Sequence, residues 1–196
     1  MSSLKKYIFY SFIVLSCVVL SSYVYARSRA TLILSSSGKV LHAKNAQKKL
    51  YPASLTKLMT VYLIFEGLKY GDLSFNKKLV VSKKASLMEP TKLGLKRGER
   101  ISVRDAVLGM LIRSFNDSAV VLAEGFSRSE KNFVKLMNKR AKQLGMYNTH
   151  FENASGLHHP KQVTTAYDMA KLTMALMRDF PEYYHFLPLC PLYCFC

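Results

Sequence analysis

The stretch Tyr51-Pro-Ala-Ser-Leu-Thr-Lys-Leu-Met-Thr60 holds a serine and a lysine three positions apart, Ser54 and Lys57. Residues three apart on a helix lie on the same face, so the two side chains can meet. A serine hydroxyl is a weak nucleophile until a base takes its proton, and a lysine amine can take that proton only when it is neutral. Burial favours the neutral amine. The stretch therefore predicts the start of a helix that carries a nucleophile and its base.

Apolar residues around and after this pair recur at helical spacing and predict that the helix is buried. They are Leu55, Leu58, Met59, Tyr62, Leu63 and Phe65. Pro52 restricts the backbone just before the serine. A serine and a lysine at this spacing also occur as a helix cap followed by a solvated lysine, and the spacing alone leaves that alternative open.

Tyr51–Thr60 resembles the nucleophile segment of the penicillin-binding D-alanyl-D-alanine carboxypeptidases, which are S11-type serine peptidases. Ser114-Phe115-Asn116-Asp117 follows where that family carries its S-x-N motif. Three further stretches are similar to the family, namely Ser37–Leu41, Phe151–Leu157 and Thr164–Ala170. The likeness runs from about residue 31 to about residue 186.

The resemblance implies the α/β fold of penicillin-binding transpeptidases and β-lactamases, a helical cluster against an antiparallel sheet, here with the C-terminal strands missing. It implies that Ser54 is the catalytic nucleophile and Lys57 its general base. Ser114 would relay a proton to the leaving amine, and Asn116 would hold the lysine and bind the substrate amide. The implied substrate is the peptidoglycan stem peptide, whose terminal D-alanine leaves through an acyl-enzyme. The implied covalent inhibitors are β-lactams, and no cofactor or metal is implied.

The sequence departs from the family pattern in two places. The middle residue of S-x-N is usually small, and Phe115 in this position either narrows the cleft or points away from it. The family also needs a K-T-G element on a strand after these motifs, to bind the substrate carboxylate and place a second cation near the base. The K-x-G triplets here begin at Lys69, Lys92 and Lys96, all before Ser114 and all turn-like. We therefore expect weak or no turnover from this chain.

The N-terminus predicts export. Lys5 and Lys6 precede an apolar run from Tyr7 to Leu20, as in a signal peptide that is cleaved after Ala26. An uncleaved anchor and a lipoprotein site at the first cysteine are the alternatives. We expect a truncated catalytic domain over residues 27–186, in the periplasm or the cell-wall space.

The formal net charge is +17, and +15 without the two signal-peptide lysines. Such an excess attracts anionic partners. For an exported protein these are wall polymers or a membrane surface, rather than nucleic acid, because the basic pairs lack interleaved aromatic residues and a nucleic-acid motif.

Periodicity predicts several helices and few strands. The expected elements are a hairpin of 31–36 and 39–43, a helix from the nucleophile to Gly67, a strand over Leu79–Ser82, and helices over 103–112, 118–126, 130–144 and from 164 or 165 to Arg178. Ser102 with Asp105, and Asp117 alone, are the predicted caps of the second and third helices. The inward positions of the 130–144 helix are Phe133, Leu136, Met137, Ala141 and Leu144, and Gly145 is expected just past its end.

The last ten residues differ in composition from the rest and hold three of the four cysteines, Cys190, Cys194 and Cys196. We interpret residues 187–196 as a divergent, frameshifted tail. A metal site that includes His185, or a disulfide, is the alternative. His158 and His159 lie in a predicted loop and are assigned a structural role.

Two rival functions follow from these observations. The chain could be a non-catalytic, basic, wall-binding remnant, whose binding would survive loss of Ser54 and fail at high salt. A β-lactamase is a weaker rival, because no glutamate stands in an E-x-x-N pattern to activate a deacylating water, and Glu152-Asn153 are adjacent.

Overall fold

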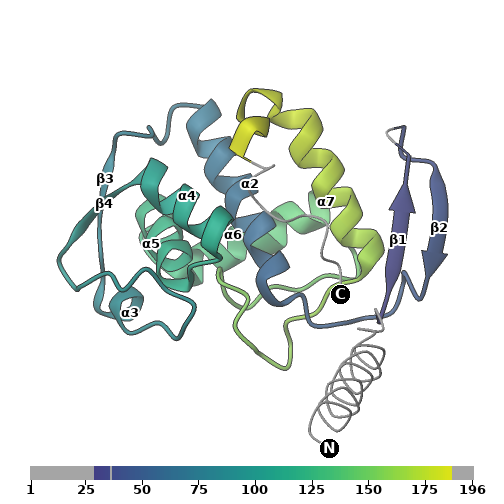
Figure 1. Ribbon diagram of the computed structural model, residues 1–196, viewed down its shortest axis with the longest axis horizontal. Coiled ribbons are helices and arrows are strands. Elements are labelled where there is room, and N and C mark those ends of the chain that lie inside the picture. The colour runs from purple at the N-terminus through teal and green to yellow at the C-terminus, as the bar shows by residue number, and fades with distance from the viewer. Residues whose placement is uncertain (1–28, 36, 187–196) are drawn as a thin grey trace, which may run out of the picture. The chain divides into compact units, whose positions relative to one another are not determined.

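The computed structural model describes residues 29–35 and 37–186 (Figure 1). The predicted signal peptide and the divergent tail lie outside the described residues. The strands are β1 (Thr31–Leu34), β2 (Val40–Lys44), β3 (Lys78–Val80) and β4 (Arg100–Ser102). The α-helices are α2 (Thr56–Lys69), α3 (Lys83–Ser86), α4 (Val103–Arg113), α5 (Asn116–Ser127), α6 (Glu130–Gln143) and α7 (Ala166–Asp179), and the 3-10 helices are η1 (Ala53–Leu55) and η2 (Pro181–Phe186).

Helix α2 is the centre of this arrangement. It contacts α4, α5, α6 and α7, and in Figure 1 it runs between α7 on one side and α4 and α5 on the other. Val61, Ile64 and Phe65 are fully buried, and burial extends around the whole helix. A helix that is apolar on every face is stable only inside a core, so the predicted burial of the serine–lysine helix is confirmed.

Several predicted helix ends are confirmed by their capping contacts. Ser102 Oγ accepts a hydrogen bond from Asp105 N at 3.0 Å and starts α4. Thr165 Oγ1 accepts from Asp168 N at 3.1 Å and starts α7. Gly145 follows α6 with a φ of +73°, a conformation that a glycine adopts without strain.

The predicted N-cap at Asp117 is wrong. Helix α5 begins at Asn116, two residues before the predicted start at Ser118, and Phe115 occupies the N-cap position. The Asp117 carboxylate is fully buried in the first turn and accepts hydrogen bonds from the backbone N–H groups of Leu93, Gly94 and Leu95. The two carboxylate oxygens of Asp117 therefore hold the 93–95 loop against α5. A sequence pattern around Asp117 does not reveal these distant partners.

Two further expectations were wrong in detail. Leu136 is 36% exposed, because it borders a surface pocket between α2 and α6 instead of the core. The strand expected to reach Ser82 ends at Val80, because Ser82 caps the short helix α3 by accepting from Ala85 N at 3.0 Å. The remaining inward positions predicted for α6 are buried or half-buried.

The strands in the described residues form two separate antiparallel pairs, β1 with β2 and β3 with β4. The predicted hairpin is confirmed as β1 and β2, and β1 contacts α7. Strand β2 is exposed throughout, and Ile33, Val40 and Leu41 present apolar surface. Within the described residues the hairpin pairs with no third strand, so β2 forms an edge of this sheet. Within the described residues, no helix combines the length and hydropathy needed to cross a bilayer.

Candidate active site

The nucleophile segment enters the site as a short 3-10 turn. Pro52 is buried at its start, Ala53 follows with a φ of +47°, and η1 then continues into α2 at Thr56. Ser54 is exposed, whereas Lys57, one turn later, is only 4% exposed. The junction thus presents the hydroxyl at the surface and draws the amine into the core.

Lys57 makes its hydrogen bonds to uncharged oxygens. Its Nζ donates to Asn116 Oδ1 at 2.9 Å and to the Ser155 carbonyl oxygen at 2.5 Å. Burial lowers the pKa of this amine from 10.5 to about 8. A neutral amine has two N–H donors and one lone pair, so donation of both hydrogens leaves the lone pair to accept a proton.

The S-x-N segment lies between α4 and α5 and contacts Ser54. Ser114 ends α4 in the left-handed region, with a φ of +58°, and its Oγ donates to Ser54 Oγ at 2.9 Å. Asn116 Nδ2 donates to the carbonyl oxygens of Glu89 and Pro90 at 3.0 and 3.2 Å. These donors fix the amide so that its oxygen faces Lys57.

Phe115 packs against α4. A β-carbon placed on Gly109 of α4 would lie 3.1 Å from Phe115 Cδ2, so the ring fills the space that this glycine leaves. Phe115 N also donates to the Gly109 carbonyl at 3.3 Å. The ring is therefore held by contacts with α4, and its two possible effects on the cleft stay predictions.

The loop over residues 151–157 supplies a site group that the sequence did not single out. The Ser155 carbonyl is the second acceptor for Lys57, and Thr60 Oγ1 donates to the Ala154 carbonyl at 2.7 Å. Gly156 has a φ of +90°, and a β-carbon on it would lie 2.0 Å from the Ala53 carbonyl oxygen. A backbone acceptor has no side-chain signature. Gly156 is the one residue in this loop whose type could have indicated a close approach to the backbone of Ala53.

The two histidines after this loop lie against other groups. His158 makes an edge contact with Tyr51, with ring centroids 4.7 Å apart, and His159 Nδ1 accepts from Lys161 N at 3.3 Å. In the part of the chain that the structure describes, no three His, Cys, Asp or Glu side chains are placed to hold a metal ion.

All four residues predicted from the sequence meet in one place. Ser54 pairs with Ser114, and Lys57 pairs with Asn116, across sequence separations of 60 and 59 residues. Residues 21–189 match the D-alanyl-D-alanine carboxypeptidase family. The chain belongs to this family.

Relatives in the family agree with this assignment. The chain is 42% identical over 149 residues to the D-alanyl-D-alanine carboxypeptidase DacF of Bacillus subtilis, covering 76% of this chain and 38% of the relative. The crystal structure of the D-alanyl-D-alanine carboxypeptidase DacD from Francisella tularensis superposes with a TM-score of 0.80 and 37% identity, over 84% of this chain and 40% of that chain.

Penicillin-binding protein D2 from Listeria monocytogenes, solved in its cefotaxime-bound form, is 34% identical with a TM-score of 0.72, over 83% of this chain and 66% of that chain. The penicillin-binding α/β fold expected from the sequence is therefore confirmed. The chain spans about two fifths of the length of the DacF and DacD relatives.

Proposed function

We propose that this chain carries the acylation machinery of a serine-type D-alanyl-D-alanine carboxypeptidase. One observation carries the proposal. The buried Lys57 Nζ donates hydrogen bonds to two uncharged oxygens, Asn116 Oδ1 and the Ser155 carbonyl, beside the exposed Ser54, whose Oγ lies 2.9 Å from Ser114 Oγ. Neutral lysine is the form that can activate a serine. Family membership supplies the substrate class, the stem peptide of peptidoglycan.

The four residues take the following roles in the proposed reaction. Lys57 accepts the proton of Ser54 as the hydroxyl oxygen bonds to the carbonyl carbon between the two terminal D-alanines. The carbon–nitrogen bond then breaks, and Ser114 gives its proton to the departing D-alanine amine while it regains one from protonated Lys57, so that the lysine is neutral again and an ester remains on Ser54. Water hydrolyses that ester and restores the serine. Asn116 keeps the lysine in place and presents its amide to the substrate.

A β-lactam would enter the same reaction, and its opened ring would remain attached to Ser54. The cefotaxime-bound form of the Listeria relative supports this expectation. We propose that acylation proceeds at Ser54 of this chain. We also propose, from the signal-like N-terminus, that the protein acts outside the cytoplasm.

Acylation by a fluorescent penicillin tests the proposal. The wild-type chain should gain one penicillin mass per molecule, and Ser54→Ala should gain none, as read by intact-mass spectrometry. Circular dichroism should show the same fold for both. A folded wild-type chain without an adduct would refute the acylation machinery and favour the wall-binding alternative.

The same adduct should form in a pH-dependent way. Because the pKa of Lys57 is lowered to about 8, the neutral fraction of the amine increases as the pH rises through that value. Below it, each pH unit raises the neutral fraction about tenfold. The adduct should therefore form about ten times faster at pH 7 than at pH 6 and reach a plateau above about pH 9. A flat profile between pH 6 and 9, corrected for hydrolysis of free penicillin, would contradict Lys57 as the base.

A further inference from the structure

The 151–157 loop is held in place by side chains outside the four site residues. Asn138 of α6 accepts from Phe151 N at 2.9 Å and donates to Phe151 O at 2.8 Å. Gln162, which is 1% exposed, accepts from two successive N–H groups of the loop at 3.0 and 3.2 Å and donates to Leu157 O at 3.1 Å. Both ends of the loop are therefore fixed by amide side chains.

Glu130, the first residue of α6, holds the middle of the loop. Its side chain is buried, and its Oε1 accepts from Ala154 N at 2.8 Å. Its Oε2 pairs with Lys84 Nζ at 2.5 Å, so the buried carboxylate has a cationic partner. An anion in the first turn of a helix is also stabilised by the helix dipole. Thr60 donates to the carbonyl of Ala154, so the peptide groups on both sides of this residue are held.

The residue after Ala154 supplies the acceptor for the proposed base. The Ser155 carbonyl lies 2.5 Å from Lys57 Nζ. The peptide between Ala154 and Ser155 is planar, so a fixed Ala154 also fixes the N and Cα atoms of Ser155, and only the φ and ψ of Ser155 then determine where its carbonyl lies. We propose that Glu130 is a positioning residue, which keeps the Ser155 carbonyl against Lys57 and so keeps water away from the amine.

The inference rests on the proposed function only where acylation is measured. The direct readout is the titration of Lys57, followed by NMR in a chain labelled with ¹³Cε-lysine and assigned with Lys57→Arg. If Glu130→Ala releases the loop, water reaches the amine and its desolvation is relieved. Its titration midpoint should then rise from about 8 by at least one pH unit, towards 10.5. The rate of adduct formation at pH 7 should fall about tenfold or more.

Glu130→Gln is the conservative variant. It keeps an amide oxygen for Ala154 N–H and loses the ion pair with Lys84, so the midpoint should rise by less than in Glu130→Ala. This near-isosteric variant also carries the test if the alanine variant does not fold, because the proposal then requires its midpoint to exceed that of the wild type.

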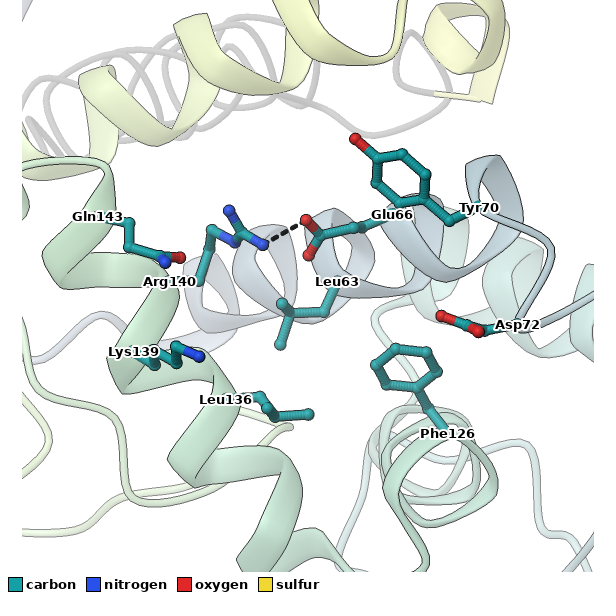
Figure 2. Close-up of a pocket in the computed structure, with 9 residues that line it drawn as sticks. All are labelled: Leu63, Glu66, Tyr70, Asp72, Phe126, Leu136, Lys139, Arg140 and Gln143. Atoms are coloured by element: carbon teal, nitrogen blue, oxygen red, sulfur yellow. Dashed lines mark hydrogen bonds and ion pairs between the residues drawn. The ribbon is translucent and has the colours of Figure 1, made fainter.

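Glu66→Gln is the matched control. Glu66 of α2 pairs with Arg140 of α6, and Figure 2 shows this ion pair among the residues that line a pocket of the structure. The pocket has a volume of about 230 Å³, and none of the four site residues lines it. The Glu66→Gln variant breaks an ion pair with α6, the helix that carries Glu130, but changes no contact of the 151–157 loop. The titration midpoint of Lys57 should therefore stay unchanged.

The outcomes separate the two proposals. An unchanged Lys57 midpoint in the folded Glu130 variants, or an equal change in Glu66→Gln, would overturn the positioning role. If the midpoint rises as expected and the wild-type chain forms no penicillin adduct, the positioning role stands and the proposed acylation fails.

Discussion

Replacing Gly156 by alanine should destabilise the fold by about 3 kcal/mol or more and nearly abolish the penicillin adduct. The new β-carbon would lie 2.0 Å from the Ala53 carbonyl oxygen and 3.1 Å from Ser54 N, both backbone atoms that cannot rotate aside. The φ of +90° adds strain for any residue with a side chain. The loop would have to leave the nucleophile segment and take the Ser155 carbonyl away from Lys57. Urea unfolding and adduct formation measure the two effects.

Gly71→Ala is the control for this prediction. Gly71 has a φ of +84°, close to that of Gly156, and a β-carbon on it would meet no atom within 4 Å. Gly71→Ala should therefore lose only the stability that the left-handed backbone conformation costs, about 1 to 2 kcal/mol, and should be acylated at the normal rate. Equal losses of stability in the two variants would mean that the clash between the new β-carbon and the Ala53 carbonyl does not contribute to the loss.

Replacing Asp117 by asparagine should lower the free energy of unfolding by about 3 kcal/mol or more. Asp117 Oδ1 accepts from Leu93 N and Ser118 N, and Oδ2 accepts from Gly94 N and Leu95 N, at 2.8 to 3.2 Å. An amide has one oxygen, so either orientation of asparagine turns its NH₂ group towards two N–H donors. Urea unfolding measures the loss.

Adduct formation should also slow in Asp117→Asn, because residues 116 and 117 fasten the same stretch of chain. Asn116 N donates to Thr91 O, and the Asn116 side chain donates to the Glu89 and Pro90 carbonyls. Asp105→Asn is the control: this aspartate occupies the same kind of first-turn position in α4 but is exposed, so its loss should be below about 1 kcal/mol. A similar loss in both variants would argue against the importance of the buried carboxylate.

The features that the sequence predicted correctly are those that depend on neighbours along the chain. The apolar run of α2, the Ser102 cap of α4 and Gly145 after α6 each follow from a few adjacent residues. The four predicted site residues fall in two short motifs of a known family, and their catalytic roles stay predictions. Their spacing alone left open a helix cap and a solvated lysine.

The features that were missed depend on contacts between distant segments. Asp117 was assigned as a helix cap from its residue type and its place before an apolar run. Its partners at 93–95 are not sequence neighbours, so the sequence pattern did not indicate them. The Ser155 carbonyl is a backbone group, which every residue has, so no residue type reveals its role. Leu136 fits the apolar stripe of α6, and its exposure reflects how α2 and α6 meet.

The distance along the chain between the partners of Lys57 has a consequence for synthesis. Asn116 lies 59 residues after the lysine and Ser155 lies 98 residues after it. A ribosome that adds about 5 to 20 residues per second reaches the second partner about 5 to 20 s after making the lysine. During that interval the amine has no folded acceptor and remains hydrated and protonated, so it has no capacity to activate Ser54. Under the proposed mechanism, Lys57 therefore cannot act as the base of Ser54 before both of its partners have been made.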